Sequence, residues 1–120
     1  MKNVILIKHP KNWGLDETEV LDKTKKALIF FSLGENVELS VIFVGRKKAK
    51  ELNMKYRKKD YIPQVLGFPM SREKDADGYI RLGDVVICTE KLKYEEKFLK
   101  KNRGEILTEW MKHGVENLLK

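Results

Sequence analysis

The spacing of apolar and polar residues changes several times along the first third of the chain. NVILI at 3–7 is a short run rich in β-branched residues, which predicts a strand. Over 17–32 the apolar residues recur every three or four positions, the spacing of an amphipathic helix. VELSVIFV at 37–44 alternates and then becomes continuously apolar, as a buried strand does. The pattern therefore predicts a strand, a helix and a second strand.

The middle of the chain continues this alternation of helices and strands. Residues 46–57 place apolar residues on one side and lysines on the other, which predicts a second amphipathic helix. QVLGF at 64–68 is a short extended run bracketed by prolines, and it cannot be a central strand along its whole length. The turn sequence DADG at 75–78 precedes a further strand pattern at 79–88.

The last third is helical in composition. An interruption at 102–104, Asn-Arg-Gly, divides it into two predicted helices, and the second helix has a wide apolar face with His113 and Asn117 at its edge. The whole pattern predicts an α/β or α+β fold with a small mixed sheet packed against helices. We expect one domain over residues 1–120, with the C-terminal helix in its core.

Composition narrows the setting of this domain. The single cysteine, Cys88, has no partner for an internal disulfide. The sequence shows neither a charged-then-apolar leader nor an apolar run long enough to cross a bilayer. We therefore expect a cytoplasmic protein that does not enter the membrane.

The positive charge is concentrated in one segment. Residues 46–59, RKKAKELNMKYRKK, hold eight basic residues and one acid, a net +7 that equals the formal net charge of the whole chain. A local patch of this kind attracts a polyanion by counterion release. The alternative, in which the lysines form a solvated helix face that only keeps the protein soluble, stays open.

Several of these segments together resemble the YbeY family of bacterial ribosomal-RNA maturation endoribonucleases. LNMKYRKKD at 52–60 is similar to the family's L-N-x-x-Y-R-x-x-D pattern, and VLGFP at 65–69 to V-L-S-F-P, with Gly67 in the place of serine. LGDVVIC at 82–88 is similar to L-G-D-I-V-I-S, and HG at 113–114 to the start of H-G-x-L-H-L-x-G-Y-D-H. The resemblance implies a single YbeY-like domain.

The resemblance also implies the partner. It indicates a factor for ribosomal-RNA maturation or small-subunit quality control, with ribosomal RNA or the small ribosomal subunit as its partner. The RNA-binding residues are then predicted in the basic segment, residues 46–59, as Lys47, Lys48, Lys50, Lys55, Arg57, Lys58 and Lys59.

Arg57 is the predicted catalytic residue. It falls on the family's arginine, which the resemblance places near the metal and RNA cleft. A guanidinium suits a phosphate because its planar fork of donors matches the oxygens. The alternative is that Arg57 pairs with Asp60 within the loop that follows the helix.

The metal motif is degenerate and truncated. The family's signature holds one zinc ion with three histidines, and His113 matches the first of them. Asn117 stands at the second position, and the third would fall three residues past Lys120. His113 is therefore the single predicted metal ligand, and the alternative is a packed, hydrogen-bonded histidine.

Two functions remain open. In the first, the protein binds RNA through the basic segment, its catalytic metal site is incomplete, and no metal need be bound. In the second, it is an active zinc-dependent single-strand endoribonuclease that processes ribosomal RNA, a hydrolase whose missing ligands come from elsewhere or from a longer native C-terminus. The sequence does not indicate the oligomeric state.

Overall fold

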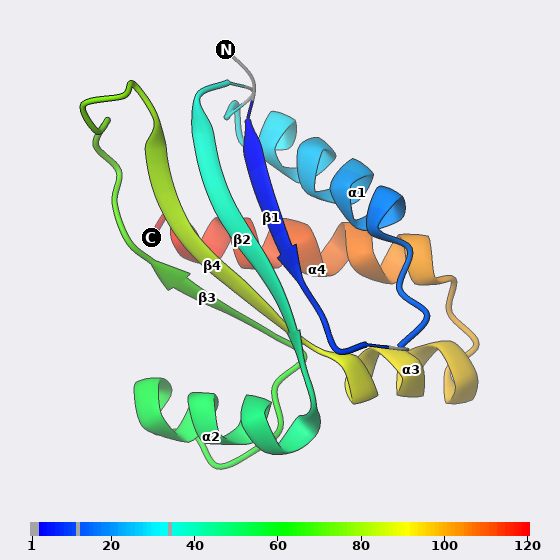
Figure 1. The fold of residues 1–120 in the computed structure, drawn as a ribbon. Coiled ribbons are helices and arrows are strands. Elements are labelled where there is room, and N and C mark those ends of the chain that lie inside the picture. Colours follow the sequence, from blue (N-terminus) through cyan, green and yellow to red (C-terminus); the bar gives the residue numbers. More distant parts are fainter. Residues whose placement is uncertain (1–2, 12, 34) are drawn as a thin grey trace.

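The computed structural model describes residues 3–11, 13–33 and 35–120. It shows a four-stranded sheet with helices against one face and a separate helix at one end of the sheet (Figure 1). The predicted mixed sheet and the two C-terminal helices are confirmed. In chain order the elements are β1 (Val4–Lys8), α1 (Glu17–Phe30), β2 (Val37–Val44), α2 (Arg46–Arg57), β3 (Val65–Pro69), β4 (Ile80–Cys88), α3 (Thr89–Phe98) and α4 (Arg103–Leu118).

The strands lie in the order β1-β2-β4-β3. β1, β2 and β4 are parallel, and β3 runs antiparallel to β4 at the edge of the sheet. The edge position agrees with the prolines that bracket the β3 sequence, because proline cannot donate to a central ladder. The register places Val85 of β4 between Val41 of β2 and Gly67 of β3.

α1 begins where Asp16 caps it, since the Asp16 carboxylate accepts hydrogen bonds from the N–H groups of Thr18 and Glu19. Its buried residues, Val20, Thr24, Ala27 and Leu28, fall on one face of the helix as predicted, and the helix packs chiefly against α4. The helix ends at Phe30, two residues before the predicted end, and Ser32 takes a left-handed φ of 62°.

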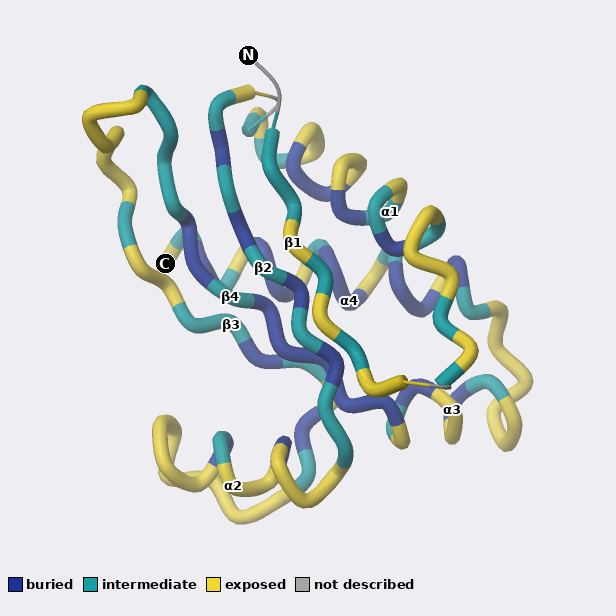
Figure 2. Tube along the Cα trace, in the orientation of Figure 1, coloured by how far each residue is buried: buried dark blue, intermediate teal, exposed yellow. Residues whose placement is uncertain are grey.

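The main core lies between the sheet and the pair α1 and α4 (Figures 1 and 2). Every second residue of β2 is buried there, from Val37 to Phe43. The C-terminal helix is in the core as predicted. Its buried residues are Gly104, Ile106, Leu107, Trp110, Met111, Gly114, Val115 and Leu118.

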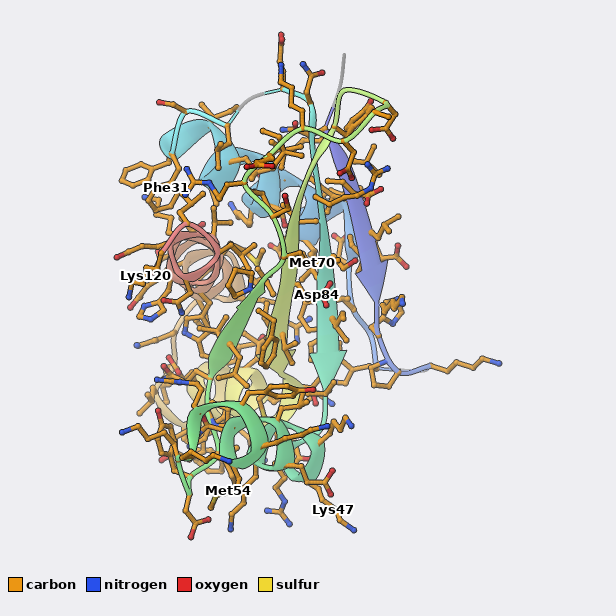
Figure 3. All side chains as sticks on the ribbon, turned by 90° about the vertical axis from the view of Figure 1, so that its left-hand side faces the viewer. Phe31, Lys47, Met54, Met70, Asp84 and Lys120 are labelled. Carbon is orange, nitrogen blue, oxygen red and sulfur yellow. The ribbon has the colours of Figure 1, made fainter. Side chains whose placement is uncertain are left out.

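α2 stands apart at the lower end of the sheet and is mostly exposed (Figure 2). Ala49 and Asn53 are its buried residues, and Tyr56 meets Phe68 of β3 with the ring centroids 5.1 Å apart. Lys47 and Met54 lie on its outer side, away from the sheet (Figure 3). None of the helices among the described residues has the length and apolar character needed to span a membrane.

Candidate functional site

A cleft of about 390 Å³ opens between α4, the start of α3 and the loop that follows α2. Its lining includes two cations, Arg57 and Lys91, together with Glu109 and His113. Trp110 and the loop residues 61–65 supply the rest of its wall. The structure thus brings Arg57 and His113, which are 56 positions apart in the chain, into one cavity.

Arg57 reaches the cleft because α2 ends there. Lys58 follows with a left-handed φ of 58°, and its N–H donates to the carbonyl oxygen of Met54. The Lys59 N–H donates to the carbonyl oxygen of Asn53, so the chain turns back at once. The loop therefore runs beside the last turn of α2, and the two together form one wall.

Asn53 connects the helix to this loop. Its side chain is fully buried, and its Nδ2 donates to the carbonyl oxygen of Tyr61 at 3.0 Å. Its Oδ1 accepts a hydrogen bond from Nη1 of Arg57 at 3.4 Å, and the same Nη1 lies 3.5 Å from the Tyr61 hydroxyl oxygen. One buried amide thus positions both the loop and the arginine.

Arg57 does not pair with Asp60, so the alternative pairing considered from the sequence is wrong. The Asp60 carboxylate lies 3.6 Å from the ammonium group of Lys50 instead. Among the residues that the structure describes, no carboxylate forms a salt bridge with Arg57. The guanidinium therefore lines the cleft without a salt-bridge partner among these residues, which leaves it free to bind an anion.

His113 is exposed and lines the cleft, so its interpretation as a packed histidine is wrong. Glu109 lies one helical turn before it on the same face of α4. Asn117, one turn further, lies against β3: a Cβ placed on Gly67 would come within 2.8 Å of the Asn117 Cβ. Of these three residues, His113 and Glu109 line the cleft and Asn117 does not.

The described residues do not fit the three-histidine zinc site that the resemblance implies. Within that part of the chain, no three side chains of His, Cys, Asp or Glu come close enough to hold a metal ion. The other histidine, His9, hydrogen-bonds Glu17 at 2.9 Å in front of α1 and does not line the cleft. His113 and Glu109 provide two candidate ligand groups, and the amide of Asn117 is a poor zinc ligand.

The predicted RNA-binding lysines are exposed but do not line the cleft. They lie on the outer side of α2 and on the turn after it, and Arg57 is the one member of the predicted set that lines the cleft. This outer group comprises Lys47, Lys48, Lys50, Lys55, Lys58 and Lys59.

Two charged residues of the cleft, Lys91 and Glu109, were not among the site residues predicted from the sequence. Glu109 carried a usable signal, since it stands four positions before His113 on a predicted helix. Lys91 carried no such signal in the sequence, because only the fold brings the start of α3 to the cleft that Arg57 lines.

The comparisons with known proteins identify the family. The family model described as Endoribonuclease YbeY matches residues 8–119. Endoribonuclease YbeY of Thermodesulfovibrio yellowstonii is 38% identical over 81 residues, which cover 68% of this chain and 50% of that protein. Endoribonuclease YbeY of Aquifex aeolicus is 40% identical over 101 residues, covering 82% of this chain and 66% of that protein.

A solved structure shows the same fold. The solution structure of a Thermotoga maritima protein matches 98% of this chain and 73% of that one, with a TM-score of 0.59 and 24% identity. The chain spans between half and two thirds of the length of the two curated relatives described above.

Proposed function

Because the chain belongs to the YbeY family, we propose that it is an RNA-binding factor in the maturation or quality control of the small ribosomal subunit. It binds ribosomal RNA, free or within that subunit, in the cytoplasm, and residues 1–120 act as one YbeY-like unit. One observation supports this function most. Arg57 faces the cleft with no carboxylate partner among the described residues, and Lys91 lines the same cavity.

The two groups of cations have different roles in this function. In the cleft, the Arg57 guanidinium donates two parallel hydrogen bonds to one phosphate, and Asn53 holds the guanidinium in place. Outside the cleft, the exposed lysines of the basic segment attract neighbouring phosphates as point charges. Phosphate contacts give affinity without reading the base sequence, so the selection of an RNA site requires further contacts.

The test is the salt dependence of RNA binding by the Arg57→Ala, Lys58→Ala double variant. Each phosphate contact to a single strand contributes about 0.7 to the slope of log K against log salt concentration. We expect weaker binding and a flatter slope. The matched control removes two exposed lysines of α1, Lys25 and Lys26. An unchanged slope in the first variant would show that the basic segment is only a solvated face.

A second candidate function is zinc-dependent cleavage of single-stranded RNA, with Arg57 as a catalytic residue and His113 as one metal ligand. It is favoured by the shared cleft of Arg57, Glu109 and His113 and by the name of the relatives. A bound zinc ion supplies a hydroxide nucleophile near neutral pH. Because the described ligands do not complete a zinc site, the cleavage reaction needs ligands from elsewhere.

Metal content separates the two functions. Elemental mass spectrometry of the purified chain and of the His113→Ala variant measures zinc per protein. Stoichiometric zinc that is lost in the variant would support the endoribonuclease. Absence of zinc from a folded protein that binds RNA would support the RNA-binding factor.

A further inference from the structure

A second groove lies beside the cleft. It has a volume of about 420 Å³ and shares two lining residues with the cleft, Ile62 and Lys91. The remainder of its lining comes chiefly from α3, so we call it the α3 groove. The two cavities are therefore neighbours on the protein surface.

The α3 groove exposes two aromatic rings. Tyr94 and Phe98 stand one helical turn apart, with 52% and 63% of their surface exposed. Their ring centroids are 5.1 Å apart, and the ring planes are tilted by 38°. On the same helix Leu92 is fully buried, so the core contact of α3 does not use these rings. Two adjacent exposed rings beside a hollow form a surface suited to a flat ligand.

The charges around these rings favour an anionic ligand. Each of the three glutamates of α3 is neutralised by a basic residue from outside the helix. The pairs are Glu90 with Arg46, Glu95 with Lys101, and Glu96 with Arg103.

The three lysines of α3 form no salt bridge with any residue in the described part of the chain. The ammonium groups of Lys93 and Lys97 lie 5.3 and 5.4 Å from the ring centres of Trp13 and Phe98. Lys91 and Lys97 both line the groove. The aromatic rings are therefore flanked by positive charge. These lysines of α3 lie outside the basic segment, residues 46–59, so the net charge of that segment did not indicate them.

We propose that the α3 groove binds a single-stranded stretch of RNA, with bases stacked on Tyr94 and Phe98 and phosphates at Lys91 and Lys97. The inference rests on the proposed function, because it concerns the same RNA strand that places a phosphate at Arg57. Base stacking on exposed rings combined with a cationic track is how proteins hold single strands without sequence preference. A duplex does not fit this role, since its bases are stacked on one another.

Lys91 and Ile62 connect the two parts of the path. Both belong to the cleft and to the α3 groove. The strand that leaves Arg57 passes Lys91 and then reaches the rings. The cleft thus holds a phosphate, and the α3 groove adds the contacts to bases that the lysines of α2 do not provide.

Binding of labelled single strands tests this inference. The Tyr94→Ala, Phe98→Ala variant is compared with the wild-type chain by fluorescence anisotropy, using an oligoadenylate and an abasic strand of the same length. We expect the variant to bind the oligoadenylate about 5- to 150-fold more weakly for each base that loses its ring, and the abasic strand as tightly as the wild-type chain does. Tyr94→Phe with Phe98→Tyr keeps both rings and should keep the affinity. Phe30→Ala, an equally exposed ring on α1, is the matched control.

A second measurement uses the wild-type chain and does not depend on how the variant folds. An oligouridylate that carries 2-aminopurine should lose fluorescence on binding, because stacking on the rings quenches this base. Unchanged emission on binding would contradict the inference.

Three results separate the inference from the function on which it rests. If the Tyr94→Ala, Phe98→Ala variant binds the oligoadenylate as tightly as the wild-type chain does, base stacking is overturned. The exposed rings would then contact a protein partner instead. An equal loss for both strands also overturns base stacking, because phosphate contacts would then explain the effect. If wild-type binding is absent, or does not change in the Arg57→Ala, Lys58→Ala variant, the proposed function fails instead.

Discussion

Gly67 of β3 and Asn117 of α4 are in direct contact. A Cβ on Gly67 would lie 2.8 Å from the Cβ of Asn117 and 2.9 Å from the carbonyl oxygen of Gly114. Both positions depart from the family pattern given in the sequence analysis, which has serine at the first and a histidine ligand at the second. The two departures therefore lie side by side, where α4 approaches the edge strand.

Gly67→Ser should destabilise the fold. The added side chain meets the backbone of α4, which cannot rotate away, so helix and strand must separate. We expect a loss of about 1–3 kcal/mol in the free energy of unfolding, measured by urea denaturation. Gly45→Ser is the matched control, since a Cβ there meets only the side chain of Glu90 at 3.5 Å. Equal stability of Gly67→Ser and the wild-type chain would show that α4 moves away without cost.

The helices and strands were predictable because apolar spacing is a local property. The bounds of α2 and β2 match the predicted ranges 46–57 and 37–44. β3 was recognised as a strand unsuited to a central position, since its prolines show in the sequence. The end of α1 differed from the prediction by two residues. Ser32 there adopts a left-handed backbone conformation, which a serine in the sequence does not predict.

The candidate site was predictable only in part, because it depends on contacts between distant segments. The resemblance indicated Arg57 and His113, and the fold places both at the cleft. Neither spacing nor composition indicated that Asn53 would hold the loop, or that Lys91 would line the same cleft as Arg57. The wrong pairing of Arg57 with Asp60 has the same origin, since sequence proximity does not decide which cation Asp60 reaches.

Asn53→Ala should weaken both stability and RNA binding. The substitution leaves the carbonyl oxygen of Tyr61 without its donor and removes the acceptor that orients Arg57. Loss of a buried hydrogen bond with an unsatisfied partner costs about 1–3 kcal/mol, which urea denaturation measures. Hydrogen exchange should show faster exchange in residues 58–64. Glu51→Ala, an exposed change on the same helix, is the control. Unchanged exchange in that loop would contradict the anchoring role.

Asp77 should retain its charge to unusually low pH. Hydrogen bonds from the Arg81 guanidinium, at 2.8 and 3.0 Å, lower the pKa of Asp77 from 3.8 to about 2, and the N–H of Tyr79 contributes further. Because the pKa is lower in the folded state, this carboxylate stabilises the fold above pH 3.8. The contribution disappears as the pH falls toward about 2.

The variant Arg81→Gln tests this assignment. We expect the pKa of Asp77 to rise toward 3.8, measured by carbon NMR of the carboxyl group during an acid titration. Asp22 is the internal control, because the Lys26 side chain lowers its pKa and Arg81 does not contribute. An Asp77 pKa that stays near 2 in the variant would assign the shift to the backbone N–H of Tyr79 instead.

Lys91→Ala should weaken RNA binding for strands of every length, whereas the Tyr94→Ala, Phe98→Ala variant should affect only strands long enough to reach the rings. The reason is that Lys91 lines both the cleft and the α3 groove, and the rings line only the groove. Removing one phosphate contact should lower the salt slope by about 0.7, and Lys91→Arg should restore it. Lys25→Ala, which removes one exposed charge from α1, should leave the slope unchanged. If Lys91→Ala weakens only the long strands, Lys91 belongs to the groove alone and the continuous path from Arg57 is wrong.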